Sequence, residues 1–234
     1  MKKTILITGA STGMGLQCVK HFYSKGWQVI AHYYEPSASL FEMHELGQIE
    51  TIEADFGKQA SLEQFLKIIE TRSIDCLVNN AGTQDFSRDR EDRIAAAQQV
   101  LMINTIAPIL IAETVIKGMK ERGQGHIINT SSIGARYGSN LAGVFYAVSK
   151  RGLEAATKSL AREGAPYNVL VNTIRPGITD TGFYDKKRES LPKRVELIPL
   201  KRIAEPQEIV NLIDFLCSSN TFITSEIIHI SGGE

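Results

Sequence analysis

Short apolar segments rich in β-branched residues alternate with segments of helical periodicity along the whole chain. Several of these apolar segments have unbroken hydrophobic centres, such as Ile5–Ile7 and Cys76–Val78, which is typical of strands buried on both faces of a parallel sheet. Regular alternation with helices is the pattern of a doubly wound α/β sheet with right-handed crossovers. The expected strands are Lys3–Thr8, Trp27–His32, Ile49–Ala54, Ile74–Val78, His126–Thr130, Val169–Ile174 and Glu226–Ile230.

The segments between the strands show the 3.6-residue period of amphipathic helices. The expected helices are one that stops at Gly26, one with Ser61 and Gln64 as its capping box, two long ones over Arg93–Glu121 and Gly143–Glu163, and a last one opened by Pro206. Because α/β folds of about 200–250 residues are often single domains, the 234 residues are expected to form one domain, residues 1–234.

Composition and charge exclude several classes of protein. The 26 Lys and Arg residues balance the 26 Asp and Glu residues, so no excess of positive charge favours a nucleic-acid partner. No apolar run approaches the ~20 residues that span a bilayer, and Ile5–Ile7 is too short for a signal peptide. The three widely spaced cysteines favour neither a disulfide framework nor a zinc site, and the five histidines show no ligand spacing. We therefore expect a cytoplasmic protein without a metal, a membrane or a nucleic-acid partner.

A glycine-rich turn follows the first strand directly, with the sequence Thr8-Gly9-Ala10-Ser11-Thr12-Gly13-Met14-Gly15. Glycine in such a turn lets the backbone bend tightly and lets a pyrophosphate approach the N–H groups at the start of the next helix. The helix dipole adds a favourable positive potential at the same place. Taken alone, the turn is also compatible with a simple flexible connection, but its position after the first strand of an α/β pattern indicates a dinucleotide site.

The end of the second strand bears on which dinucleotide is preferred. Sites for NAD usually place Asp or Glu there to hold the ribose 2′-OH, whereas Tyr33 and Tyr34 precede the first acidic residue, Glu35. The pattern favours NADP and makes Tyr33 a candidate contact, while Thr12 stands where an arginine would clamp a 2′-phosphate. Asp55, after the third strand, is a candidate partner of the adenine amino group, with a turn or helix-capping role as the alternative.

Tyr146 and Lys150 form a Y-x-x-x-K pattern, which places both on one face of a helix. Tyrosine titrates near 10, but a neighbouring ammonium favours the phenolate, so such a tyrosine can exchange a proton with a carbonyl or an alcohol. Ser131 and Ser132 follow a predicted strand, and a hydroxyl at the carboxyl end of a strand is well placed for a ligand in the crevice of an open sheet. An amphipathic helix surface and ordinary turn chemistry are the alternatives.

Together these motifs resemble the short-chain dehydrogenase/reductases of the classical type, over essentially the whole chain. The resemblance rests on Thr8-Gly9-x-x-x-Gly13-x-Gly15, Asp55, Asn79-Asn80-Ala81-Gly82, Asn104, Ser132, Tyr146-x-x-x-Lys150 and Pro176-Gly177-Ile178-Thr179-Asp180-Thr181. It implies a single-domain Rossmann-type fold, a doubly wound parallel sheet of about seven strands with helices on both faces. It also implies an NAD(P)-dependent oxidoreductase that transfers a hydride between the nicotinamide and a carbonyl or alcohol.

The resemblance implies a role for each site residue. In the catalytic set, Ser132 would orient the carbonyl and Tyr146 would act as acid or base. Lys150 would hold the nicotinamide ribose and lower the tyrosine pKa, and Asn104 would anchor a water that relays protons. Ser132 lies one residue further from Tyr146 than is usual in the family, so Ser131 remains a rival. The cofactor would be held by Gly9, Ser11, Thr12, Gly13, Met14, Gly15, Tyr33, Asp55, Asn79, Ala81, Gly82, Tyr146, Lys150, Pro176, Gly177, Ile178 and Thr181.

The segment Pro199–Glu208 and the ending Ser231-Gly232-Gly233 resemble the 3-oxoacyl-acyl-carrier-protein reductase branch. This implies a thioester-borne carbonyl substrate and a homotetramer or homodimer. An acyl carrier protein is acidic, so the basic residues of Lys186–Arg194 are a candidate docking site, with a solvated helix face as the alternative. Reductases of sugars, polyols and small ketones share this ending. A dinucleotide-binding regulator without turnover is the competing class, which the complete catalytic set disfavours.

Overall fold

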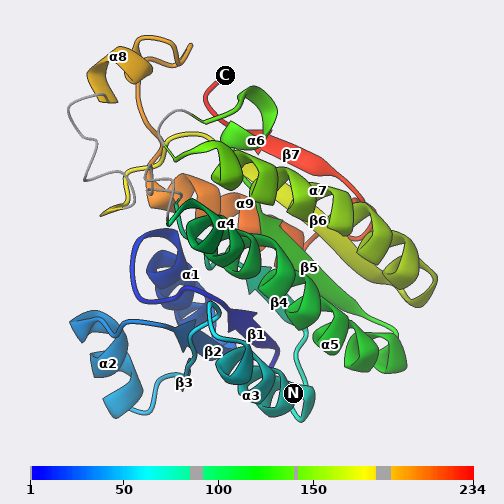
Figure 1. Ribbon diagram of the computed structural model, residues 1–234. Coiled ribbons are helices and arrows are strands. Elements are labelled where there is room, and N and C mark those ends of the chain that lie inside the picture. Colours follow the sequence, from blue (N-terminus) through cyan, green and yellow to red (C-terminus); the bar gives the residue numbers. More distant parts are fainter. Residues whose placement is uncertain (1, 85–91, 140–141, 183–190) are drawn as a thin grey trace.

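The computed structural model describes residues 2–84, 92–139, 142–182 and 191–234. Its strands form one parallel sheet in the order β3-β2-β1-β4-β5-β6-β7 (Figure 1). The strands are β1 (Thr4–Ile7), β2 (Gln28–Tyr33), β3 (Glu50–Glu53), β4 (Cys76–Asn79), β5 (Gly125–Thr130), β6 (Val169–Pro176) and β7 (Ile227–Ile230). All of the strands expected from the sequence are therefore present, and their ends agree to within two residues.

Helices cover both faces of this sheet, which confirms the doubly wound fold (Figure 1). On one face lie α1 (Gly13–Ser24) and α9 (Pro206–Ser218), which pack against each other. On the other face lie α3 (Gln59–Glu70), α5 (Ala107–Arg122) and α7 (Val144–Gly164). The remaining described helical segments are α2 (Ala38–Glu45), α4 (Arg93–Leu101), the π-helical η1 (Met102–Ile106), α6 (Gly134–Tyr137), the 3-10 turn η2 (Ala165–Tyr167) and α8 (Leu191–Val195).

Each face of the sheet has its own hydrophobic core. Leu6 and Leu77 point into the core under α3, α5 and α7, whereas their neighbours Ile5, Ile7 and Val78 point into the core under α1 and α9. Since successive side chains of a strand alternate between faces, burial on both sides requires the unbroken apolar runs seen in the sequence. Burying each such side chain contributes about 1.5–3 kcal/mol to folding.

The order in which the chain adds strands reverses at β1, because β1 pairs with β2 on one side and with β4 on the other. At such a switch point the loops that leave the strands diverge, and a crevice opens beyond the carboxyl ends of the strands. The glycine turn between β1 and α1 lies at this point. The fold therefore places the predicted dinucleotide site where an open α/β sheet binds its ligand.

One local expectation was wrong, and another lacked a detail. The helical stretch expected over Arg93–Glu121 is present and runs to Arg122, but within it the π-helical turn η1 separates α4 from α5. The capping box of α3 is absent, because the N-cap is Lys58 and the Ser61 hydroxyl accepts the Asp55 N–H at 2.8 Å. The Ser61 hydroxyl is thus used by a contact outside the helix, although the local pattern assigned it to the cap.

The cysteines also depart from expectation. Cys76 of β4 and Cys217 of α9 form a disulfide, although their spacing in the sequence suggested no framework. The bond joins the centre of the sheet to the helix that covers it. Cys18 is a buried free thiol in α1, and burial raises its pKa to about 12, so it remains protonated at neutral pH.

The stretch Arg93–Arg122 is long and apolar enough to cross a membrane, by length and composition alone, which the sequence analysis did not anticipate. A single helix of this kind is a weak sign of a membrane segment, because core helices of sheet proteins have the same composition. Here the α5 half of the stretch buries Ile111, Val115 and Met119 against the sheet. In α5, at least three of its apolar side chains are thus used in the core.

Candidate active site

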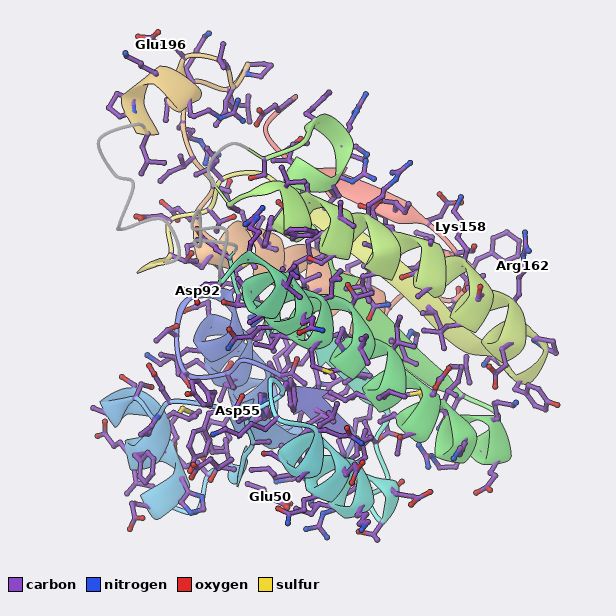
Figure 2. All side chains as sticks on the ribbon, viewed as in Figure 1. Glu50, Asp55, Asp92, Lys158, Arg162 and Glu196 are labelled. Atoms are coloured by element: carbon purple, nitrogen blue, oxygen red, sulfur yellow. A yellow bond between two sulfur atoms is a disulfide. The ribbon has the colours of Figure 1, made fainter. Side chains whose placement is uncertain are left out.

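A cleft of about 560 Å³ lies at the carboxyl ends of the strands, over the switch point, and its volume is usual for a small-molecule site. The described lining comes from the glycine turn, the segments after β2 to β6, and α7. Most of the predicted site residues are in this lining: Gly9, Ser11, Thr12, Gly13, Met14, Asp55, Ala81, Gly82, Ser131, Ser132, Tyr146, Lys150, Pro176, Gly177 and Thr181. Asp55, labelled in Figure 2, follows β3 at the edge of this cleft.

The other predicted residues lie behind the lining. Gly15 packs under the glycine turn, and Ile178 is buried beyond β6. Asn79 donates from Nδ2 to Pro108 O and Asn129 Oδ1 inside the sheet. Tyr33 packs its ring edge-on against Phe41, and its hydroxyl donates to Glu53 Oε2 at 3.4 Å. The exposed ring of Tyr34 lines the cleft instead, together with Glu35.

The glycine turn forms a cradle that side chains would fill. Gly9 and Gly13 have φ of +65° and +53°, which favour glycine. A Cβ on Gly13 would come within 3.0 Å of the Thr181 side chain, and a Cβ on Gly15 would overlap the Gly9 carbonyl oxygen. Thr12 precedes α1 but makes no capping hydrogen bond with its side chain, so N–H groups of the first turn of α1 are left for a ligand. This arrangement fits a pyrophosphate.

Asn80 holds the cradle in place, a role the sequence analysis did not assign. Its Nδ2 donates to the carbonyl oxygens of Thr8 and Gly9, each at 3.1 Å. In return, the Thr8 hydroxyl oxygen accepts the N–H groups of Asn80 and Ala81 at 3.0 Å. The end of β4 is thereby fastened to the turn after β1. The signal in the sequence was the pair of asparagines, of which only the first was chosen.

Replacing Gly15 with alanine is expected to distort this cradle, because the new Cβ would meet backbone that cannot rotate away. We expect a loss of about 1–3 kcal/mol in the free energy of unfolding, together with weaker dinucleotide binding. Urea denaturation and a dinucleotide titration measure both. Gly118→Ala in α5 is the matched control, because its Cβ would face only the flexible end of Arg122 and alanine favours a helix. Equal behaviour of the two variants would contradict the cradle.

Tyr146 and Lys150 lie in α7, and both are almost completely buried at the bottom of the cleft. Lys150 Nζ donates to Thr130 O at 2.8 Å and lies 5.9 Å from the centre of the Tyr146 ring. Burial lowers the pKa of Lys150 to about 8, because removing the ammonium from water disfavours its charged form. Since this pKa is only about one unit above neutral pH, Lys150 is mostly charged at pH 7, and its ammonium lies near the Tyr146 ring.

Asn104 lies in the π-helical turn η1 and fixes the opposite wall of the cleft. Its Oδ1 accepts the Thr83 N–H, and its Nδ2 donates to Thr83 O, both at 2.8 Å. Nδ2 also lies 3.0 Å from Ser149 Oγ, next to Lys150 in α7. A Cβ on Gly82 would come within 3.3 Å of Lys150 Nζ and 3.4 Å of Asn104 Oδ1, so only glycine leaves this space open. A π turn of this kind is often found at functional sites.

The two candidate serines have different surroundings. Ser131 Oγ donates to Glu154 Oε1 at 2.6 Å, and this carboxylate is itself paired with Arg175. Ser132 Oγ accepts the Gly134 N–H at 3.1 Å, and its hydroxyl hydrogen has no partner among the described residues. Ser132 is thus the serine with a donor to offer a ligand in the cleft.

The basic segment Lys186–Arg194 is described only in part. Lys186, Lys187 and Arg188 lie outside the described residues, whereas Lys193 and Arg194 belong to α8. Arg194 forms an ion pair with Glu234 at the end of the chain. Figure 1 shows α8 apart from the sheet, and Figure 2 shows Glu196 beside it. Of the two described basic side chains in this segment, Arg194 is therefore already paired with a carboxylate.

The fold and this site define the class of nicotinamide-dependent oxidoreductases. Residues 3–192 match the family model for short chain dehydrogenase, and the chain belongs to the short-chain dehydrogenase/reductase family. It is 32% identical to the 3-oxoacyl-acyl-carrier-protein reductase of Aquifex aeolicus, with 99% of this chain and 96% of that protein aligned. It is 31% identical to the 3alpha-hydroxysteroid dehydrogenase of Mediterraneibacter gnavus, over 98% and 96%. The solved 4-hydroxyisoleucine dehydrogenase complexed with NADH has a TM-score of 0.90 at 27% identity, over 99% and 98%.

Proposed function

We propose that the protein is an NAD(P)(H)-dependent carbonyl reductase or alcohol dehydrogenase, formed by one domain over residues 1–234, with Tyr146 as the general acid or base. The observation that carries the proposal is the position of Tyr146, Lys150 and Ser132 around one cleft that also contains the glycine cradle. When bound, the nicotinamide dinucleotide supplies or takes up the hydride.

The residues of the chain have separate tasks in this mechanism. The Ser132 hydroxyl donates to the substrate oxygen and orients it, and Tyr146 gives that oxygen a proton in reduction or removes one in oxidation. The Lys150 ammonium holds the ribose and favours the phenolate form of Tyr146. Asn104 fixes the Thr83 backbone and with it the wall of the cleft beside Lys150. The water relay from Asn104 that the resemblance implies is part of the same proposal.

For the cofactor we propose NADP(H) over NAD(H). The last residue of β2 is Tyr33 and not Asp or Glu, so no carboxylate at that position opposes a 2′-phosphate. Its side chain does not line the cleft, because its hydroxyl donates to Glu53. Glu35 acts in the opposite direction, because it lines the cleft, where Ser11 Oγ donates to its carbonyl oxygen at 2.5 Å. Glu35→Gln is therefore expected to strengthen NADPH binding and to leave NADH binding unchanged. Tighter binding of NADH than of NADPH by the unaltered protein would refute the preference.

For the substrate we propose a 3-oxoacyl thioester, with an acyl carrier protein as a candidate partner. The similarity to the 3-oxoacyl-acyl-carrier-protein reductase supports this choice. The similarity to a hydroxysteroid dehydrogenase supports the second candidate, another small ketone, sugar or polyol. We further propose that the protein is cytoplasmic. We also propose a homotetramer or homodimer, because the helices α4 and α7 expose Ile94, Val144 and Val148, which a second copy would cover.

The test is the oxidation of NADPH and of NADH, followed by absorbance, with acetoacetyl-coenzyme A and a panel of ketones, sugars and polyols. Turnover with the thioester supports the first substrate class, and turnover only with another carbonyl supports the second. Dinucleotide binding without turnover on any carbonyl or alcohol would identify a regulator and refute the enzyme.

The pH dependence of the reaction provides a further prediction. Because burial lowers the pKa of Lys150 to about 8, its positive charge is lost as the pH rises through that value. The interactions that stabilise the Tyr146 phenolate and hold the ribose are lost with it. We expect kcat/KM for carbonyl reduction to decline above about pH 8. Lys150→Arg keeps the charge at high pH, so any activity it retains is expected to lack this decline. A flat profile for the unaltered protein through this range would contradict the assignment.

A further inference from the structure

His32 is a buried histidine that the proposed mechanism does not use. It lies near the end of β2, only 2% exposed, and its ring borders the cleft beneath the glycine turn. Like the other four histidines, it shows no metal-ligand spacing in the sequence. Its surroundings give it a different task.

The two ring nitrogens of His32 bind two different walls of the cleft. Nε2 lies 3.1 Å from the carbonyl oxygen of Ala54, which can only accept, so Nε2 carries the hydrogen. Nδ1 is then free to accept, and the Gly9 N–H donates to it at 3.1 Å. Burial lowers the pKa of His32 to about 4, more than the bond to Ala54 raises it, so the ring is neutral and keeps both bonds at neutral pH.

Aromatic rings fix the orientation of this imidazole. Phe56 stacks on it with ring centroids 3.9 Å apart and an angle of 6° between the planes, and Phe65 meets it edge-on at 5.1 Å. Phe56 and Ala54 also line the cleft, on either side of Asp55. The ring therefore has one rotation, in which it joins the glycine turn to the segment after β3.

The bond to Gly9 has a consequence for the turn. Gly9 is the residue with φ of +65° at which the chain leaves β1, and the Ala10 N–H is also bound, to His32 O at 2.8 Å. Two consecutive N–H groups are thus held by one residue of β2. The N–H groups that follow, at the start of α1, are left to face the cleft.

From this geometry we infer that His32 is a positioning residue for dinucleotide binding, which holds the phosphate cradle and the adenine side of the cleft in one arrangement. The inference rests on the proposed function only in taking a nicotinamide dinucleotide as the ligand. His32 itself reaches the cofactor through Gly9 and through the Ala54–Phe56 segment.

Three variants separate the contacts of the ring. Asparagine places an amide oxygen near the position of Nδ1 and keeps an acceptor for Gly9, but it does not reach Ala54. Glutamine extends a donor toward Ala54 and lacks the short acceptor. Phenylalanine keeps the ring stacked on Phe56 and loses both hydrogen bonds. Asparagine and glutamine lose the aromatic packing alike, so the direction of a difference between them shows which bond matters more for binding, the one to Gly9 or the one to Ala54.

The measurements are the Kd of NADPH, NADH and ADP by calorimetry, kcat at saturating cofactor, and Tm. We expect His32→Phe and His32→Gln to raise every Kd about tenfold, the worth of one well-placed hydrogen bond. His32→Asn is expected to stay within about threefold of the unaltered protein, and kcat is expected to be unchanged in all three. Should His32→Phe fail to fold, the comparison of asparagine with glutamine decides.

Equal Kd values for the asparagine and glutamine variants, with only Tm lowered, would show that His32 merely fills the core and would overturn the inference. A fall in kcat without a change in Kd would overturn it as well. Failure of the proposed function looks different, because the unaltered protein would then bind the dinucleotide without turnover and the differences in Kd would remain.

Discussion

Replacing Tyr146 with phenylalanine is expected to lower kcat by about 10²- to 10⁴-fold, the usual contribution of a positioned general acid or base. The change removes one hydroxyl and leaves the ring, which is buried in α7 at the bottom of the cleft. The glycine cradle and Lys150 are untouched, so the Kd of the dinucleotide is expected to change far less than kcat. Steady-state turnover on an accepted carbonyl and a dinucleotide titration measure the two quantities.

Tyr23→Phe is the matched control, since this tyrosine lies in α1, is partly exposed, and does not line the cleft. It is expected to keep full turnover. Full turnover in Tyr146→Phe as well would show that another group transfers the proton. A large rise in the Kd of the dinucleotide would instead mean that the hydroxyl serves binding rather than the proton step.

Hydrophobic patterning was sufficient for the fold because burial on both faces of the sheet leaves few alternatives. Strands such as β1 and β4 must be apolar throughout, since both of their faces are covered by helices. The glycine turn was also predictable, because Gly9, Gly13 and Gly15 each occupy a position where a Cβ would meet neighbouring atoms. In these cases the physical constraint acts on the residue itself, and the residue type therefore reveals it.

Other features depend on partners distant in the sequence, and local patterns could not reveal them. Tyr33 was expected at the cofactor, but its hydroxyl donates to Glu53 on the neighbouring strand and Tyr34 lines the cleft instead. The disulfide joins Cys76 to Cys217 across 141 residues of sequence. The choice between Ser131 and Ser132 also required the structure, because it depends on which hydroxyl is already bound.

The group that binds Ser131 leads to the second large expected effect. Glu154 of α7 and Arg175 of β6 form a buried ion pair with two hydrogen bonds, Nη2 to Oε2 at 2.6 Å and Nε to Oε1 at 2.8 Å. Both side chains are at most 5% exposed. The carboxylate also accepts from Ser131 and from Arg151, a more exposed residue one turn away in α7. Burial alone would raise the pKa of Glu154, but these hydrogen bonds outweigh it and hold the pKa below its usual value.

Glu154→Leu is expected to lower the free energy of unfolding by about 3–5 kcal/mol, because it leaves the Arg175 guanidinium buried without its carboxylate. For a chain of this size that corresponds to a drop in Tm of roughly 6–20 °C. Arg175→Leu is expected to cost less, since Glu154 keeps Arg151 and Ser131 as partners. Urea denaturation of the two single variants and of the double variant completes a thermodynamic cycle.

The double variant, Glu154→Leu with Arg175→Leu, separates two explanations of such a loss. If the cost comes from an unpaired buried charge, removing both charges restores most of the stability, because an apolar pair of similar volume is often neutral or better. The double variant is also expected to change how the free energy of unfolding depends on pH at acid pH. Since the folded pKa of Glu154 is depressed, its contribution is present above the unfolded pKa of about 4.3 and is lost as the pH falls through the folded value. The double variant lacks that part of the acid destabilisation. Additive losses in the double variant would mean that the two side chains are not coupled, and that each stabilises the fold through its other contacts.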